Sequence, residues 1–141
     1  MEKTPLQLLK EQTSQLSDIF DNPSDKIRAL EKSLHNSHTN YSFKYQICTE
    51  GAKTPVETAW FLAWLVNEGS KNYRLFLISE EIQYAQDKVS EDSWVPIISK
   101  TVFKKVFIET KLEMRLKYGR YLILFIDEFT KELKKYRESI S

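Results

Sequence analysis

The sequence predicts a mainly α fold, a compact multi-helix bundle of about six or seven helices around a central apolar helix at residues 55–68. Two observations predict it. The 4 Pro residues stand where helices would begin, because the proline ring suits the first helical turn and loses no hydrogen bond there. The 3 Gly residues stand where helices would end, because glycine readily adopts the left-handed conformation that closes a helix. These low numbers of proline and glycine argue against a turn-rich all-β protein.

Apolar residues at three- and four-residue spacing outline the helices of the first part of the chain. A capping box at Thr4-Pro5-Leu6-Gln7 opens a predicted helix over residues 4–20. Pro23 opens a second over residues 23–35, with Ile27, Leu30 and Leu34 on one side. A third is predicted from about residue 40 to Gly51. There, however, residues 41–48 alternate like a strand and are rich in β-forming residues, so an extended segment stays open.

Residues 55–68 are apolar on nearly every side. The sequence Thr54-Pro55-Val56-Glu57 fits a capping box, and Gly69 would end the helix. A helix without a polar face belongs at the centre of a bundle. Trp60 and Trp64 lie one turn apart on this helix, and with Trp94 they form a candidate aromatic pocket for a flat ligand. Packing in the core is the ordinary explanation for such residues, and we prefer it.

Three more helices are predicted over residues 72–89, about 96–119 and about 120–138. Residues 106–126 also suit a β-hairpin that turns at Gly119-Arg120, which gives an alternative α+β fold with a hairpin at 111–126. In that hairpin Glu109 and Lys111 would share one side of a strand, as a metal-dependent nuclease site requires, whereas a helix separates them by roughly 200°. The residues are mostly good helix formers, so we favour the helix.

The 141 residues are expected to form a single helical domain, 1–141, because this length buries a sizeable core. The longest apolar runs fall far short of the ~20 residues that cross a bilayer. The first residues lack the apolar core of a signal peptide. Cys48 is the only cysteine, so an intramolecular disulfide is impossible. We expect a cytoplasmic protein that does not bind membranes.

Charge is distributed unevenly along the chain. Residues 1–98 carry 10 Lys/Arg and 14 Asp/Glu, a net charge of −4, and residues 99–141 carry 11 Lys/Arg and 6 Asp/Glu, a net charge of +5. Such polarity can steer a partner, although it can also hold one fold together. The candidate partner-binding residues are the acidic Glu80, Glu81 and Asp87 and the basic Lys104, Lys105, Lys111, Arg115, Lys117 and Arg120.

The sequence contains no glycine-rich phosphate loop, and His35 and His38 have no nearby ligand to complete a metal site. We therefore expect neither cofactor nor metal. By elimination, the predicted function is that of a non-enzymatic regulatory or adaptor protein that binds another protein or a second copy of itself. The first alternative is nucleic-acid binding by the basic C-terminal helices, with Tyr118 or Tyr121 stacking on bases. The second is a metal-dependent nuclease-like enzyme, if residues 106–126 form a hairpin.

Overall fold

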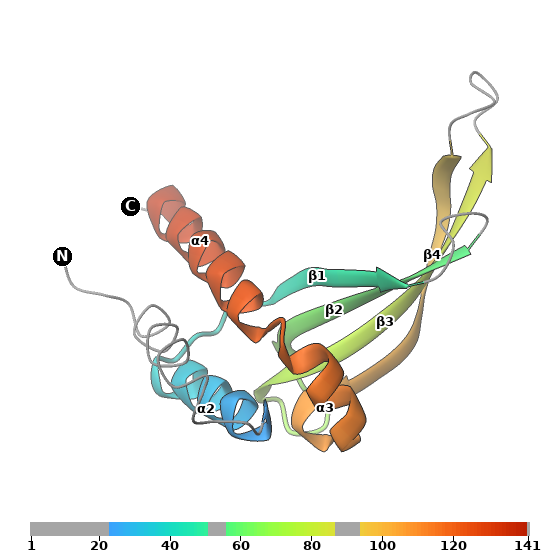
Figure 1. Cartoon of the computed structure of the whole chain (residues 1–141). Coiled ribbons are helices and arrows are strands. Elements are labelled where there is room, and N and C mark those ends of the chain that lie inside the picture. Colours follow the sequence, from blue (N-terminus) through green and yellow to red (C-terminus); the bar gives the residue numbers. More distant parts are fainter. Residues whose placement is uncertain (1–22, 51–55, 87–93, 141) are drawn as a thin grey trace.

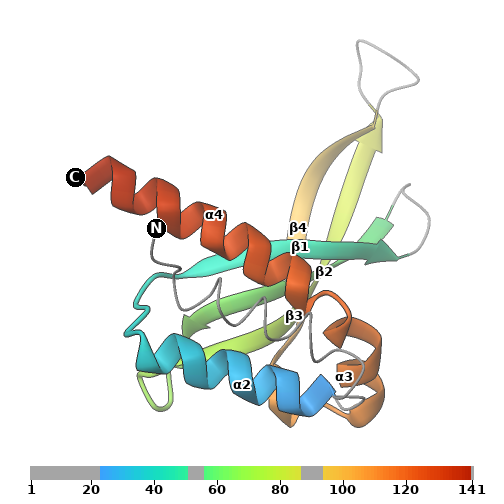
Figure 2. The same ribbon diagram turned by 60° about the vertical axis from the view of Figure 1, so that its left-hand side comes forward.

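The protein has an α+β fold built on one four-stranded antiparallel sheet, in a computed structural model that describes residues 23–50, 56–86 and 94–140 (Figure 1). The strands lie in the order β1-β2-β3-β4, which is also their order in the chain. Their bounds are β1 Phe43–Glu50, β2 Val56–Val66, β3 Tyr73–Gln86 and β4 Trp94–Val106. Helix α2 (Pro23–Asn36) precedes the sheet, and the 3-10 helix η1 (Phe107–Glu109), α3 (Leu112–Gly119) and α4 (Leu122–Ile140) follow it. The α-helices lie on one side of the sheet (Figure 2).

The prediction of a helical bundle around residues 55–68 is wrong, because Val56–Val66 form β2, the strand between β1 and β3. Trp60, Leu62 and Trp64 face the main core, and Ala63 packs in a second cluster on the other face of the sheet. An interior strand that is buried on both faces is apolar at every position, just as a fully buried helix is. The hydrophobic pattern alone therefore could not separate the two structures.

The predicted helices over residues 72–89 and the first part of 96–119 are also wrong. Strands β3 (Tyr73–Gln86) and β4 (Trp94–Val106) occupy the described residues there and pair antiparallel, with Leu77 opposite Lys105 and Ile82 opposite Ser99. Leu75, Phe76, Leu77 and Ile78 are all buried, so β3 too has two apolar faces there. The helix predicted from about residue 40 to Gly51 is wrong as well, because Phe43–Glu50 form strand β1, which agrees with the extended alternative for residues 41–48.

Two predicted helices are confirmed, with bounds shifted by a few residues: α2 (Pro23–Asn36) and α4 (Leu122–Ile140). The alternative hairpin at 111–126 is wrong, because α3 and the start of α4 occupy these residues. Gly119 does end α3, but its φ is not positive. A Cβ at this position would lie 2.8 Å from the Cβ of Pro23, so close approach of α3 to α2 is the reason for glycine here. The helix predicted over residues 4–20 lies outside the described residues.

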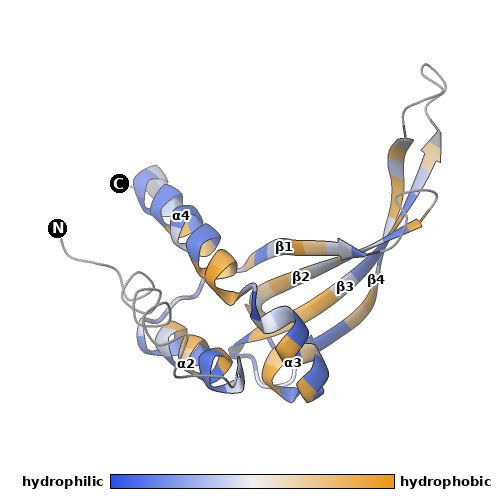
Figure 3. Ribbon diagram, viewed as in Figure 1, coloured by the Kyte–Doolittle hydropathy of each residue, from blue (hydrophilic) through white to orange (hydrophobic). Residues whose placement is uncertain are grey.

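The main hydrophobic core lies between the sheet and the helices. In it, the ring of Phe43 on β1 stacks on Phe129 of α4, with centroids 4.9 Å apart. Figure 3 shows hydrophobic residues along the strands and at the start of α4, where that helix meets the sheet. The opposite face of the sheet has a smaller cluster, over which lysine side chains lie. Lys44 Nζ is 4.3 Å from the ring centroid of Phe61, and Lys104 Nζ is 5.1 Å from that of Phe76.

Strands β3 and β4 continue beyond the other two strands as a two-stranded arm (Figure 1). Strand β4 is the outer strand of the sheet on this side. Two irregularities in its pairing with β3 each leave one β4 residue without a partner in the register, Val102 and Ile97. Such bulges bend a strand and turn side chains away from the regular sheet faces.

Candidate functional site

A polar cleft of about 630 Å³ opens between α2 and the turn that connects β2 to β3. Side chains from α2 form one wall, and the turn, the start of β3 and η1 form the other. The lining residues are Arg28, Glu31, Lys32, His35, Asn36, Ser70, Asn72, Arg74 and Ile108. The α2 members recur every three or four positions, the spacing that places side chains on one face of a helix.

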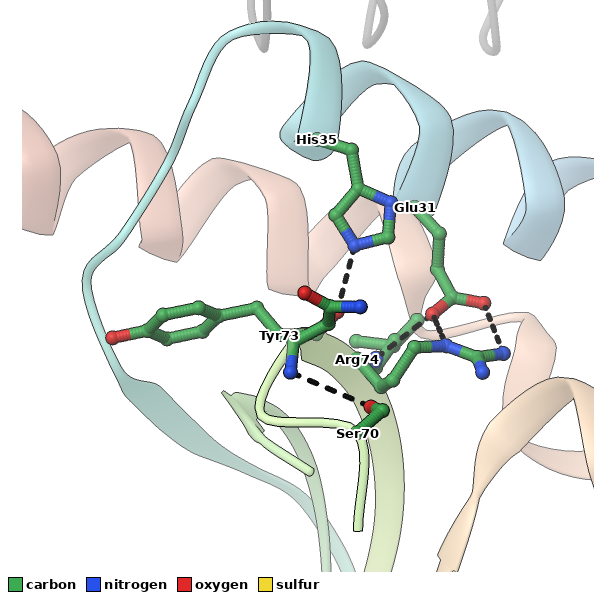
Figure 4. A network of polar contacts seen from close by, with 7 residues as sticks. Glu31, His35, Ser70, Tyr73 and Arg74 are labelled. Atoms are coloured by element: carbon green, nitrogen blue, oxygen red, sulfur yellow. Dashed lines mark hydrogen bonds and ion pairs between the residues drawn. The ribbon is translucent and has the colours of Figure 1, made fainter. Parts of the chain in front are cut away.

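An ion pair between Glu31 and Arg74 joins the two walls (Figure 4). Arg74 Nε donates to Glu31 Oε2 at 2.7 Å, and Nη2 donates to Oε1 at 3.3 Å. The backbone N–H of Leu75 also donates to Glu31 Oε2, at 3.1 Å. Glu31 is only 6% exposed, so these donors replace the water that its carboxylate lost on burial. The hydrogen bond with Glu31 raises the pKa of Arg74, and the pair fixes the orientation of the guanidinium.

His35 makes a second connection between α2 and β3. Its Nε2 lies 2.7 Å from the carbonyl oxygen of Tyr73, and because a carbonyl can only accept, the histidine donates. The imidazole also packs on the indole of Trp64, with ring centroids 5.2 Å apart. Trp64 Nε1 in turn donates to the carbonyl of Thr39 at 2.8 Å, just after α2. His35 thus has a role in anchoring the end of α2.

Sequence reasoning missed this cleft. Glu31 and Arg74 are 43 positions apart, and no local pattern links them. The available signal was the polar spacing of Arg28, Lys32 and His35 opposite the apolar stripe of the same helix. That spacing indicates a solvated face, but it does not show which segment lies across from it.

The candidate partner-binding residues on the sheet do not form one surface. Glu80 forms an ion pair with Lys44, whose Nζ is 2.7 Å away. Glu81 lies opposite Lys100 in the β3–β4 register. Lys104 and Lys105 follow each other on β4, so their side chains point to opposite faces. Asp87 lies outside the described residues.

The remaining basic candidates surround α3, and most are bonded within the protein. Lys111 precedes the helix as its N-cap residue. Arg115 Nη1 donates to the hydroxyl of Ser24. Lys117 Nζ pairs with Glu50 at 2.7 Å, and Arg120 Nε donates to the carbonyl of Lys117 at 3.0 Å.

The structure does not bring the three tryptophans together as a pocket. Trp64 is fully buried and Trp60 is 8% exposed, and both pack in the main core. Trp60 stacks on Tyr118 with centroids 4.4 Å apart. In the strand register, Trp60 lies opposite Ser79 of β3, and Ser79 lies opposite Phe103 of β4. Trp94 is nine positions from Phe103 along β4, a distance of roughly 25–30 Å. The side chain of Trp94 lies outside the described residues.

Glu50, at the end of β1, connects the sheet to α3. Tyr118 donates its hydroxyl to Glu50 Oε1 at 3.0 Å. The hydrogen bond from Lys117 is the main cause that holds the pKa of Glu50 below its ordinary value. Burial raises the pKa of Tyr118 far above that of a free phenol, and the bond to Glu50 adds to this effect. Burial also raises the pKa of the nearby Cys48, and a thiol that stays protonated is a weak nucleophile.

The strand geometry that the nuclease hypothesis needs is not formed. Glu109 ends η1, and Lys111 stands just before α3, so residues 106–126 contain no hairpin. Among the described residues, no three His, Cys, Asp or Glu side chains gather as a metal site. In the same part of the chain, no helix is both long and apolar enough to cross a bilayer.

The outer strand β4 presents a second candidate site. We call its exposed aliphatic side chains the β4 surface: Val95 (44% exposed), Ile97 (59%), Ile98 (52%) and Val102 (60%). Lys100, Lys104 and Lys105 interrupt and follow them, and β4 contains no Asp or Glu.

Comparisons with protein-family models, with curated proteins and with the solved structures find no match to this chain.

Proposed function

We propose that this chain is a non-enzymatic regulatory or adaptor protein that binds another protein through the β4 surface. One observation carries the proposal: four aliphatic side chains, 44% to 60% exposed, lie within eight consecutive residues of one outer strand. Exposed aliphatic residues are normal when they are scattered, but a cluster of them commonly marks an interaction site. Covering four half-exposed side chains contributes about 4 kcal/mol. The loss of translational and rotational entropy on association offsets much of this free energy, so electrostatic attraction must contribute to the affinity as well.

The charge of β4 defines the chemistry of the partner. Three lysines and no carboxylate give β4 itself a charge of +3, and Glu81 of β3, which lies opposite Lys100, offsets part of it, so the strand suits a segment that carries both Asp/Glu and apolar side chains. Pairing two copies of β4 would bring lysines from both chains to one seam, where like charges repel. We therefore favour a different protein over self-association.

Side-chain docking suits this strand better than a continued β-ladder. Pro96 lacks an N–H donor, the bulges at Ile97 and Val102 break the regular edge, and the lysines disfavour pairing with other basic strands. These are the features by which sheet edges avoid indiscriminate pairing. They leave the aliphatic side chains accessible, so the features that block aggregation would also make binding selective.

Nucleic-acid binding has weaker support. Tyr118 is only 2% exposed, and its hydroxyl is bonded to Glu50, so its ring is not presented to bases. Lys117 forms an ion pair, and Arg115 is bonded to Ser24, so neither is free to contact phosphate without losing a bond. A cytoplasmic location remains part of the proposal, because the unpaired thiol of Cys48 suits a reducing compartment.

The test uses the wild-type protein, an Ile97→Asp/Val102→Asp variant and a Val66→Asp control as baits in native extracts. Val66 is an exposed aliphatic residue at the end of β2, 40% exposed, so its substitution matches the chemistry away from the β4 surface. All three baits should melt alike, because the substituted side chains are exposed.

We expect one partner that binds the wild type and the control, is lost with the double variant and is weakened by salt. The protected segment of that partner, mapped by hydrogen exchange, should be acidic and apolar. Equal capture by the double variant would refute the proposal. Bound material that is destroyed by nuclease would favour the nucleic-acid alternative, and a stable wild-type dimer in sedimentation would favour self-association.

A further inference from the structure

The polar cleft beside α2 has an excess of positive charge that its internal pairing does not use. In the described part of the chain, Arg28, Lys32 and Arg74 line it together with one carboxylate, that of Glu31. Glu31 is fully engaged by Arg74 and a backbone N–H, so its charge is already balanced. The charge of Glu109 also reaches Arg74, which reduces the excess but does not remove it. Asp25 pairs with Arg28 and offsets a further part, so the cleft retains up to about one positive charge, and more where a ligand displaces Asp25.

The cationic groups stand on both sides of the cleft. Arg74 uses Nε and Nη2 to bind Glu31, which leaves Nη1 with its two N–H donors. Across from it, Arg28 and Lys32 are exposed side chains one helical turn apart on α2. Arg28 lies 3.5 Å from Asp25, an exposed pair that contributes little and can be exchanged for a better acceptor.

The second wall of the cleft is formed before any ligand arrives. In the β2–β3 turn, Asn67 N–H donates to the carbonyl of Asn72 and Lys71 N–H donates to that of Asn67, both at 2.7 Å. Ser70 Oγ accepts from the N–H of Asn72 at 3.4 Å (Figure 4). A fixed wall reduces the conformational entropy that binding would cost.

The lining also indicates what kind of molecule fits. A volume of about 630 Å³ falls within the range of about 300–1,000 Å³ that is usual for small-molecule sites. Apart from Ile108 the lining residues in the described part of the chain are polar by type, with amide groups from Asn36 and Asn72, although apolar atoms contribute somewhat more of the lining surface than polar atoms do. A hydrophilic anion would find charged and neutral donors together here.

We infer that this cleft binds a small hydrophilic ligand that carries two or more negative charges, of the phosphoryl or dicarboxylate class. The Glu31–Arg74 pair alone has a simpler explanation, because it attaches α2 to β3. That explanation does not account for Arg28 and Lys32, which face the same space; Arg28 pairs there with Asp25, an exposed carboxylate outside the described lining of the cleft. This inference concerns a surface different from β4, so it stands or falls separately from the proposed protein binding.

The experiment titrates the full-length protein with sodium pyrophosphate and, separately, with sodium succinate, at constant ionic strength maintained with chloride. Binding is followed by amide NMR shifts and by calorimetry. The test variant is Arg28→Gln/Lys32→Gln, which keeps the Glu31–Arg74 pair. The control is Lys26→Gln, two residues before Arg28 and therefore about 200° around the same helix.

We expect saturable binding of at least one anion, with shifts at Ser70, Asn72 and the facing turn of α2. The double variant should bind about tenfold more weakly, and the control should bind like the wild type. Saturation by pyrophosphate alone assigns a phosphoryl ligand, and saturation by succinate alone assigns a dicarboxylate. No saturation with either anion, shifts elsewhere in the molecule, or equal weakening by Lys26→Gln would overturn the inference.

Discussion

Gly119→Ala should destabilise the protein, although alanine is the better helix former. Gly119 ends α3 with a φ that is not positive, so the backbone itself accepts a side chain. The new Cβ would lie 2.8 Å from the Cβ of Pro23, whereas two carbon atoms prefer about 3.5–4.0 Å. Helices α2 and α3 would therefore have to separate by roughly 1 Å at their contact, as the difference between these distances requires.

The expected loss follows from two opposing effects. Forcing an extra methyl group into a packed contact costs about 1–3 kcal/mol. Replacing glycine by alanine within a helix returns up to about 1 kcal/mol, and less at its last residue. The net loss should be about 1–2 kcal/mol in the free energy of unfolding, which lowers Tm by roughly 3–8 °C for a chain of this length.

Urea unfolding at equilibrium measures this loss, and Gly69→Ala is the matched control. At Gly69 a Cβ would meet Asn67 Oδ1 at 3.8 Å, an ordinary contact, so we expect a change within about 0.5 kcal/mol. A double-mutant cycle with Pro23→Gly removes the opposing Cβ and should recover most of the loss. If Gly119→Ala is as stable as the wild type, or if the cycle shows no coupling, close approach does not explain this glycine.

Two further predictions concern polar groups in the interior. Glu31→Ala should lower the free energy of unfolding, measured in urea, by about 2–4 kcal/mol. The substitution leaves the Leu75 N–H without its acceptor, and it leaves Arg74, which is 28% exposed, with water in place of its carboxylate partner. The same substitution at the exposed Glu68 should cost little, and equal losses would contradict the role of the pair. Burial raises the pKa of Tyr118 above the ordinary 10.0, so above that pH the unfolded chain ionises while the folded one does not, and stability falls as pH rises. Tyr118→Phe should remove this part of the alkaline loss, and an unchanged pH dependence would refute the assignment.

The sequence by itself determined the helices that have one apolar face. Ile27, Leu30 and Leu34 recur at helical spacing after Pro23, and α2 begins at that proline. The good helix formers at 112–119 likewise outweighed the alternating pattern that suggested a hairpin, and α3 forms there. In α2, local preference and burial of one apolar face favour the same structure, whereas α3 follows local preference, since its Leu112 and Leu116 are about half exposed.

Only the tertiary structure decided the sheet and the cleft. Strands β2 and β3 lie between neighbours and are buried on both faces, so their sequences carry neither the alternation of a half-buried strand nor the stripe of a surface helix. What makes them strands is pairing with segments elsewhere in the chain, which no local window contains. The ion pair between Glu31 and Arg74 depends on the same long-range assembly, because the two residues are 43 positions apart and meet only in the folded structure.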